Sequence, residues 1–391
     1  MITTPVPTHF TSLVPLAWAL RAAGHDVTVA GQPDIVPTVR SAGLIAASVG
    51  ERFDILTYLR AKLPGTSRPL EAWPRPAPEQ MGFFGRVWMD HCRKMLPAYL
   101  ELARELRPGL IIAEQLEFAS LIVGGLLDIP VVHHRWGVDA ISDLALRDAR
   151  AELADLTTEL GLARLPDPLR KLDPCPPSLQ VPASAPADPV RYVPFNGTTV
   201  LPDWVRQGHT RDPGVRRVVV SLGNLTLALN GGPFVRRLLC ALAELPGIEL
   251  IVTVDQAYRD ALLPLPAPVR VVDPTPLHLF LGACDAVVHH GGAGTTLTAT
   301  AAGLPQLVLP QIADAFAAGE RLQAVGAGLV LDQVAGQDDP GTLRDALAAL
   351  LSEPGYRAAA RELGREMARM PDPQQVADQL VGQGVATAGR A

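Results

Sequence analysis

Residues 285–305 read Asp-Ala-Val-Val-His-His-Gly-Gly-Ala-Gly-Thr-Thr-Leu-Thr-Ala-Thr-Ala-Ala-Gly-Leu-Pro, and this is the most informative stretch of the chain. Its apolar start predicts a buried strand that runs into His289 and His290. The glycines that follow let the backbone approach a ligand closely, and a helix then begins at Thr295 and Thr296 and ends at Gly303. Such a turn directs N–H groups and the positive end of a helix toward one place, which favours a bound phosphate.

The turn differs from the two most familiar phosphate-binding motifs. It has no GxxxxGKS or GxxxxGKT sequence, so it is not a P-loop, and it has no GxGxxG sequence, which disfavours a nicotinamide dinucleotide. His290 and the hydroxyl of Thr295 lie at its edge and add hydrogen-bond donors that suit a diphosphate. The alternative is a tight turn whose small residues serve only packing.

Strands and helices alternate on both sides of this stretch. In the second half we expect strands at 217–222, 248–254, 270–272 and 286–289, with helices at 233–245 and 277–283. In the first half we expect strands at 2–4, 27–30, 44–49, 110–113 and 130–133, with a helix from about residue 13 to Gly24. This alternation is typical of the α/β class with doubly wound parallel sheets.

The segment 165–213 is rich in proline, which excludes a regular helix or a central strand and predicts a connector between two α/β halves. The carboxyl ends of the parallel strands in two such halves would face a cleft, where ligands bind in open α/β sheets. We therefore expect an N-terminal domain at 1–195, a linker at 196–214, a C-terminal domain at 215–372 and a final helix at 373–391. Only four residues precede the first proline, so either the first strand is short or the true start lies upstream.

Length and composition favour a globular protein of two domains. The chain has 391 residues, of which 48% are hydrophobic and 19% charged, and this excludes the composition of a disordered chain. A formal net charge of −6 gives no reason to expect binding of nucleic acid, which needs a concentrated basic face. We find no apolar run of membrane-spanning length, no signal peptide and only four scattered cysteines, and we therefore expect a cytoplasmic protein with no membrane span.

The stretch 285–305 resembles the nucleotide-binding signature of GT-B glycosyltransferases, in particular the bacterial group that glycosylates macrolides, enediynes and related natural products. Five blocks in the same order carry the resemblance over nearly the whole chain: 8–25, 191–197, 200–204, 273–278 and 287–296. The resemblance implies two Rossmann-like domains facing a cleft, with the donor in the C-terminal domain and the acceptor in the N-terminal one. It also implies a final helix that crosses back to the N-terminal domain.

The resemblance implies two catalytic residues in the N-terminal domain. His9 matches the catalytic base of the family, and a neutral imidazole in the loop after the first strand is suited to accept a proton at physiological pH. Glu114 lies where many members have the aspartate that orients this histidine. The alternatives are a histidine that caps its own helix and an ordinary carboxylate, since Glu is one methylene longer than Asp.

The resemblance also implies a set of residues that bind the donor. His290 matches the histidine on the diphosphate, and Asp314 matches the acid of an Asp-Gln pair that binds sugar hydroxyls. Ala315 replaces the glutamine of that pair, which favours a deoxysugar donor, although neutral variation explains it equally well. The remaining candidates surround the phosphates and the base: Ser221, Gly223, Asn224, Pro276, Gly291, Gly292, Gly294 and Thr295.

These matches imply an inverting glycosyltransferase that moves a sugar from a nucleoside-diphosphate donor, by family habit dTDP-linked, to a hydroxyl of a natural-product aglycone. The chain has no Asp-x-Asp motif, and a helix N-terminus can hold the leaving charge, so we expect neither a metal nor another cofactor. One alternative is a GT-B sugar-nucleotide epimerase, and another is a non-catalytic sugar-nucleotide-binding partner of a second transferase. The sequence leaves open whether the protein forms a homodimer.

Overall fold

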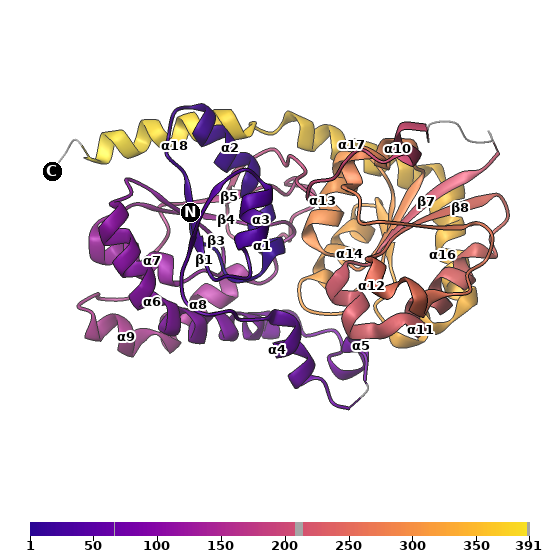
Figure 1. The fold of residues 1–391 in the computed structure, drawn as a ribbon, viewed down its shortest axis with the longest axis horizontal. Coiled ribbons are helices and arrows are strands. Elements are labelled where there is room, and N and C mark those ends of the chain that lie inside the picture. The colour runs from indigo at the N-terminus through magenta and orange to yellow at the C-terminus, as the bar shows by residue number, and fades with distance from the viewer. Residues whose placement is uncertain (66, 208–213, 389–391) are drawn as a thin grey trace. The chain divides into compact units, whose positions relative to one another are not determined.

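The computed structural model describes residues 1–65, 67–207 and 214–388, which form two compact units (Figure 1). The described residues within Met1–Ile55, Ala77–Phe195 and Met370–Ala391 make up the N-terminal unit, and those within Leu56–Pro76 and Asn196–Arg369 the C-terminal unit. Residues 56–76 thus group with the C-terminal unit, although we expected them in the N-terminal domain. Residues 370–372 group with the N-terminal unit, although we expected them in the C-terminal domain. Of the linker expected at 196–214, residues 208–213 lie outside the described residues.

Arg68 explains why the segment 56–76 belongs to the C-terminal unit. Its guanidinium is almost fully buried and donates to Asp338 at 2.9 Å. It also lies over the ring of Phe234, with 4.6 Å between the guanidinium carbon and the ring centroid. A buried charge with an ion pair and an aromatic face is costly to expose, so this contact holds the segment in place.

The C-terminal unit is built on a six-stranded sheet in which every neighbouring pair is parallel. Its order is β12-β11-β10-β7-β8-β9, so the order of connection reverses between β7 and β10, where His289 pairs in register with Ser221. A doubly wound sheet binds its ligand outside the carboxyl ends of the strands at such a reversal. The strands are β7 (Arg216–Ser221), β8 (Ile248–Thr253), β9 (Val269–Val272), β10 (Ala286–His289), β11 (Gln306–Val308) and β12 (Gly328–Val330).

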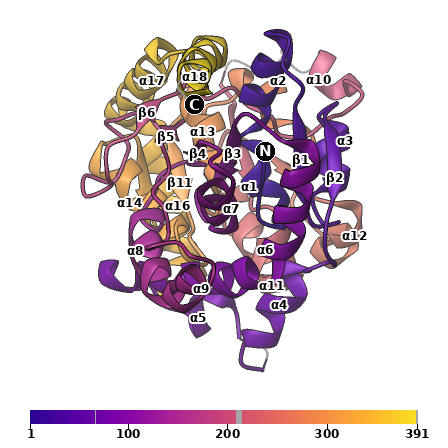
Figure 2. The same cartoon turned by 90° about the vertical axis from the view of Figure 1, so that its left-hand side faces the viewer.

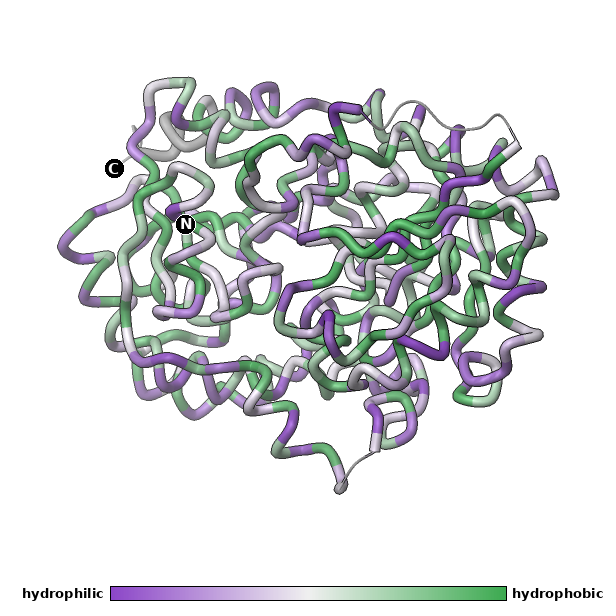
Figure 3. The backbone as a smooth tube through the Cα atoms, turned by 45° about the vertical axis from the view of Figure 1, so that its right-hand side comes forward, coloured by the Kyte–Doolittle hydropathy of each residue, from purple (hydrophilic) through white to green (hydrophobic). Residues whose placement is uncertain are grey.

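Alternating strand residues form two cores, one on each face of this sheet. Figure 3 shows that hydrophobic stretches recur along the backbone between hydrophilic ones. Val218 and Val220 pack on one face with residues of α11 and α16, whereas Val219 packs on the other with residues of α13. The helices of the unit are α10 (Asp203–Gln207), α11 (Asn224–Ala243), α12 (Gln256–Arg259), η2 (Asp260–Leu262), η3 (Leu277–Leu279), η4 (Leu281–Ala283), α13 (Ala293–Ala301), α14 (Ala315–Ala324), α15 (Val334–Asp338), α16 (Pro340–Ser352) and α17 (Pro354–Arg369).

The N-terminal unit also has parallel strands in a doubly wound order. Ile2 forms single bridges to Ala30 of β1 and Ala113 of β3, so it joins a two-stranded and a four-stranded sheet into the order β2-β1-Ile2-β3-β4-β5-β6 (Figure 2). The strand expected at 2–4 is therefore reduced to this one residue. The strands are β1 (Thr28–Gly31), β2 (Ile45–Ser48), β3 (Ile111–Glu114), β4 (Val131–His134), β5 (Arg170–Asp173) and β6 (Asp188–Pro189).

The proline-rich segment contains regular structure, so our expectation that it excludes a helix or a central strand was wrong. The strand β5 lies between β4 and β6 and pairs with both. Pro168 and Pro174 lie outside the strand at its two ends, where a missing N–H costs no ladder hydrogen bond. The short helix α10 likewise begins just after Pro202.

Helices cover this sheet, and α18 completes the N-terminal core. It packs along α2, and its Val376, Ala377 and Leu380 join the core that contains Leu16 and Leu20 (Figure 1). The helices are α1 (Pro7–Thr11), α2 (Val14–Ala22), α3 (Val36–Ser41), α4 (Ile55–Lys62), α5 (Pro69–Ala72), η1 (Pro78–Gly85), α6 (Arg86–Leu106), α7 (Ala119–Leu127), α8 (Ser142–Glu152), α9 (Ala154–Glu159) and α18 (Pro373–Ala388), of which α4 after Ile55 and all of α5 belong to the C-terminal unit.

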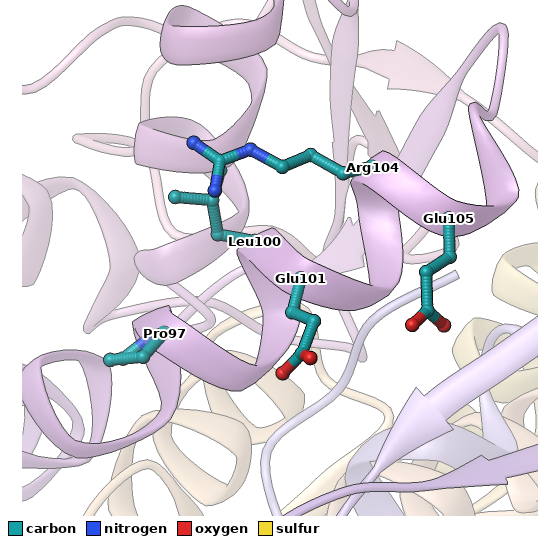
Figure 4. Close-up of a pocket in the computed structure, with 5 residues that line it drawn as sticks. All are labelled: Pro97, Leu100, Glu101, Arg104 and Glu105. Carbon is teal, nitrogen blue, oxygen red and sulfur yellow. The ribbon is translucent and has the colours of Figure 1, made fainter.

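The helix α6 buries one face, including Trp88, Met95 and Tyr99, and exposes the other. A depression of about 550 Å³ on the exposed face is lined only by α6 residues: Pro97, Leu100, Glu101, Arg104 and Glu105 (Figure 4). None of these residues is a candidate site residue. Among the helices that the structure describes, none has both the length and the apolar character needed to cross a bilayer.

Candidate functional site

The glycine-rich turn between β10 and α13 lies at the reversal point of the C-terminal sheet. His290, Gly291 and Gly292 form this turn, and Gly294 and Thr295 lie in the first turn of α13. The first N–H groups of any helix have no partner within the helix, and they carry the positive end of its dipole. The structure therefore has a glycine-rich turn followed by a helix N-terminus at the predicted place, and phosphate binding there stays a prediction.

The side chain of His289 stabilises the turn by hydrogen bonds. Its fully buried ring accepts a hydrogen bond from the Gly291 N–H at Nδ1 (3.0 Å) and lies 2.9 Å from Oε1 of Gln306 at Nε2. This geometry places the ring proton on Nε2, and burial lowers the pKa of His289 to about 3, so the ring is neutral. Because the N–H of Gly291 is used here, Gly291 shapes the turn and does not offer that N–H to a phosphate.

Two glycines make room for the side chain of His290. A Cβ on Gly292 would lie 2.4 Å from Nε2 of His290, and a Cβ on Gly223 would lie 2.9 Å from Cε1. Gly223 also has φ +72°, a conformation that L-residues rarely adopt. Burial lowers the pKa of His290 to about 4, although the Ser221 backbone opposes the shift, so His290 is a neutral hydrogen-bonding group.

The end of β7 contributes the neighbouring candidates. Ser221 ends the strand beside His289, and its Oγ accepts a hydrogen bond from Oγ1 of Thr253 at 3.2 Å. Gly223 is the N-cap of α11, and Asn224 is the first residue of that helix. The structure therefore brings the end of β7 and the His290 turn together.

The start of α14 packs against the same turn. Gly291 has φ +89°, and a Cβ there would lie 2.7 Å from the backbone oxygen and 3.0 Å from the Cβ of Ala315. Asp314 is the N-cap of α14, and the preceding Ala313 adopts φ +48°, an unusual conformation for a residue with a side chain. Pro276 is the N-cap of η3, and η3 contacts α13, the helix that follows the turn.

His9 lies at the corresponding reversal point of the N-terminal sheet, between the Ile2 bridge and β3. We expected His9 in a loop, but it lies on the short helix α1. Pro7 can begin this helix because a first-turn residue needs no helical N–H partner. Nδ1 of His9 lies 2.8 Å from Oγ1 of Thr4 and 3.9 Å from Oε1 of Glu114, at the end of β3.

Two tryptophans surround the imidazole of His9. Trp136 stacks on it, with 4.0 Å between the ring centroids and 24° between the planes, and Trp88 meets it edge-on at 5.9 Å. Neither contact was predicted from the sequence. His133 and His134, which end β4 before Trp136, are almost fully buried, which fits packing in the core.

Burial changes the pKa of both His9 and Glu114 in the direction of the neutral form. It lowers the pKa of His9 to about 3. It raises the pKa of Glu114 to about 8, with a further rise from Glu117, while the Leu116 N–H and Thr4 oppose the change. Near pH 7 the pair therefore consists of a neutral imidazole and a neutral carboxyl group.

Known proteins resemble this chain over nearly its whole length. Family models for the N- and C-terminal domains of erythromycin biosynthesis protein CIII-like proteins match residues 18–223 and 236–382. The TDP-daunosamine transferase DnrS of Streptomyces peucetius is 35% identical, over 98% of this chain and 96% of its own. The L-demethylnoviosyl transferase of Streptomyces niveus is 36% identical, over 96% of this chain and 95% of its own.

A solved structure extends the likeness to the fold. The spinosyn rhamnosyltransferase SpnG, complexed with thymidine diphosphate, is 36% identical to this chain with a TM-score of 0.86, and the match covers 97% of this chain and 98% of that one. This confirms the expected GT-B class with two Rossmann-like domains. The chain therefore belongs to the erythromycin biosynthesis protein CIII-like family of GT-B natural-product glycosyltransferases.

Proposed function

We propose that this glycosyltransferase moves a deoxysugar from a thymidine-diphosphate donor to a hydroxyl group of an antibiotic aglycone, with inversion at the anomeric carbon. The named relatives transfer deoxysugars in antibiotic biosynthesis, and SpnG binds thymidine diphosphate. The observation that carries the proposal is the His290 turn, because it combines a helix N-terminus with an imidazole for which two glycines leave room at the reversal point of the sheet.

In the proposed reaction, Nε2 of His9 takes the proton of the acceptor hydroxyl as its oxygen bonds to the anomeric carbon. The bond between that carbon and the phosphate oxygen breaks, and the nucleoside diphosphate leaves with the bonding electrons. The N-terminus of α13 and the side chain of His290 stabilise the charge on the leaving group. Glu114, which lies near Nδ1 of His9, orients the imidazole.

The proposal is tested by incubating the purified chain with a panel of dTDP-deoxysugars, with and without polyketide aglycones. Mass spectrometry then detects the glycoside, and NMR determines its anomeric configuration. We expect nucleotide release that depends on the aglycone and an inverted product. Conversion of the donor sugar without an aglycone would indicate the epimerase alternative, and binding without any turnover would indicate a partner protein.

Metal removal is a separate test. Activity is expected to persist in excess EDTA, because backbone N–H groups and His290 stabilise the diphosphate in the proposed reaction. Initial rates with EDTA, and after adding Mg²⁺ or Mn²⁺, provide the measurement. A strict requirement for either ion would show that the leaving group is stabilised in another way.

Replacing Ala315 by glutamine is expected to reduce the preference for a deoxysugar donor. Ala315 is buried and lies close to Gly291. A glutamine at this position would offer a hydrogen-bond donor and an acceptor to sugar hydroxyl groups, and a deoxysugar lacks one or more of these hydroxyl groups. One or two neutral hydrogen bonds correspond to a change of about tenfold in the ratio of kcat/KM values. Competition between a dTDP-deoxyhexose and dTDP-glucose in one mixture measures this ratio. An unchanged ratio would mean that position 315 does not contact the sugar.

A further inference from the structure

One face of the His9 imidazole is covered by the indole of Trp136. The two ring centroids are 4.0 Å apart and the ring planes are inclined by 24°, so the rings are stacked. Trp136 is only 6% exposed, whereas the side chain of His9 keeps 19% of its surface accessible. The stacked face of the imidazole is therefore closed to water, while another part of the ring remains accessible.

The polar groups beside the ring offer it little negative charge. Oγ1 of Thr4, a neutral hydroxyl group, lies 2.8 Å from Nδ1 of His9. Oε1 of Glu114 is 3.9 Å from the same nitrogen, which is beyond the range of a hydrogen bond. Burial raises the pKa of Glu114 to about 8, so its carboxyl group is mostly neutral near pH 7. A positive charge on His9 is therefore not neutralised by Glu114 at this pH.

The proposed reaction creates such a charge, because the imidazole becomes an imidazolium when Nε2 of His9 takes the acceptor proton. The face of an aromatic ring carries negative charge density, and it attracts a cation that lies within about 6 Å of the ring centroid, with Trp the strongest. Stacking on Trp136 therefore stabilises the imidazolium more than the neutral imidazole. An interaction that strengthens in this way toward the transition state accelerates the reaction.

The segment that carries Trp136 is fixed by polar contacts on both sides of it. The almost fully buried guanidinium of Arg135 donates to Oδ2 of Asp173 at 2.9 Å. The side-chain amide of Gln180 donates to the same carboxylate oxygen at 2.8 Å and to the backbone oxygen of Gly137 at 3.2 Å. Breaking a buried ion pair leaves an uncompensated charge, which is costly. The indole is therefore held in place before any charge develops, as electrostatic stabilisation of a transition state requires.

We propose that Trp136 is a positioning residue that holds the ring of His9 and, through its indole face, stabilises the imidazolium that forms when His9 takes the acceptor proton. The inference deepens the proposed function, since it rests on His9 as the base. It assigns to an aromatic ring the stabilisation that a carboxylate provides in a His–carboxylate pair.

Fluorination of the indole tests this charge effect with little change in the shape of the side chain. Fluorine withdraws electron density from the ring face and is only slightly larger than hydrogen. Tryptophans with one to four fluorines on the benzene ring are incorporated at position 136 alone, and the transfer rate is measured in a single turnover. We expect a fall of about twofold for each fluorine, because the full interaction corresponds to about 10-fold to 30-fold in rate. A rate that does not depend on the number of fluorines would overturn the inference.

Trp18 provides the matched control for fluorination. It lies on α2 in the same N-terminal unit, it is exposed, and its ring meets Phe195 edge-on at 5.5 Å. Its indole N–H donates to the backbone oxygen of Ala42 at 2.8 Å. The same fluorines at position 18 should leave the transfer rate unchanged. A fall as steep as that at position 136 would show a general effect of fluorine on the protein and would contradict a specific role of Trp136.

A comparison in the His9→Gln variant separates charge from packing. Glutamine cannot become a cation, so the residual transfer rate of this variant should not respond to fluorines at position 136. If the residual rate fell as steeply as the rate of the wild type, the fluorines would be disturbing the packing, and the stabilisation of an imidazolium would be rejected.

Ordinary substitutions give an independent result. Trp136→Phe keeps an aromatic face, whereas Trp136→Leu keeps only an apolar side chain. We expect kcat to fall by about threefold in Trp136→Phe and by about tenfold or more in Trp136→Leu. The affinity for thymidine diphosphate should stay within about twofold, because the proposed donor contacts lie in the other unit. Equal kcat values in the two folded variants would count against the aromatic face, and the fluorine series decides the matter if Trp136→Leu does not fold.

The inference and the proposed function fail in different ways. A wild-type chain that forms no glycoside with any member of the substrate panel would reject the proposed function and the inference with it. A wild-type chain that transfers the sugar with inversion, at a rate that fluorination of Trp136 does not change, would overturn the inference alone.

Discussion

Replacing His9 by alanine is expected to lower kcat by about 10²-fold or more and to change the affinity for thymidine diphosphate by no more than about twofold. His9 is the base of the proposed reaction, whereas the proposed donor contacts lie in the other unit, around His290. A loss of this size corresponds to about 2.7 kcal/mol of transition-state stabilisation. Steady-state kinetics with the donor and acceptor identified in the substrate panel, together with calorimetric titration of the nucleotide, measure the two quantities.

The control for this variant is His25→Ala, because His25 is exposed and lies outside the site. His9 also stacks on Trp136, so a small side chain could disturb the packing, and His9→Gln keeps more of the volume while removing the base. Thermal melting curves show whether each variant is folded. Turnover near the wild-type rate in folded His9→Ala and His9→Gln would reject His9 as the base.

The α/β class could be predicted because short apolar runs, such as Val218–Val220 in β7 and Leu250–Val252 in β8, alternate with helical segments. The strand expected at 286–289 has the same bounds as β10, and the ends of most other expected strands shift by about one residue. The three-residue strands β11 and β12 were not predicted, since so short a segment shows no periodicity. The strand β5 was missed because the number of prolines does not show whether they fall inside a strand or at its ends.

Within the candidate site, the parts formed by one continuous stretch could be predicted, and the parts formed by distant segments could not. The His290 turn is contained in one continuous stretch, so its helix start and its need for glycine were evident from the sequence. Thr4, Trp88 and Trp136 surround His9 from separate segments, and only the tertiary structure brings them together. The sequence also suggests that His290 contacts the diphosphate and that His289 supports the turn, but the bond from the Gly291 N–H to His289 was not predicted.

The positions of both groups follow from one topological rule. Ile2 and β3 are neighbours in the N-terminal sheet, and β7 and β10 are neighbours in the C-terminal sheet, and at both places the order of connection reverses. Loops that leave adjacent strands in opposite directions separate there, which leaves room for side chains to meet a ligand. This explains why His9 with Glu114, and Ser221 with His290, are neighbours despite their distance in sequence.

Replacing His290 by alanine is expected to lower kcat/KM by about 10²-fold to 10³-fold and to weaken the binding of thymidine diphosphate. The neutral imidazole donates one hydrogen bond to the leaving diphosphate in the proposed reaction, and this bond strengthens as negative charge develops on the phosphate. His290→Asn keeps an N–H donor and should recover part of the loss. Kinetics and nucleotide titration on the same preparations separate transition-state stabilisation from ground-state binding.

Gly292→Ala tests the same side chain without changing it. The new Cβ would lie 2.4 Å from Nε2 of His290, so the imidazole must move, and the variant should reproduce much of the His290→Ala effect. Gly282→Ala is the matched control, because its Cβ would have no neighbour within 4 Å and its backbone needs no left-handed conformation. If Gly292→Ala and Gly282→Ala both kept wild-type kcat/KM, the position of His290 would not matter for transfer. The leaving charge would then have to be stabilised by the N–H groups of α13 alone, and a normal rate in His290→Ala would have to accompany that result.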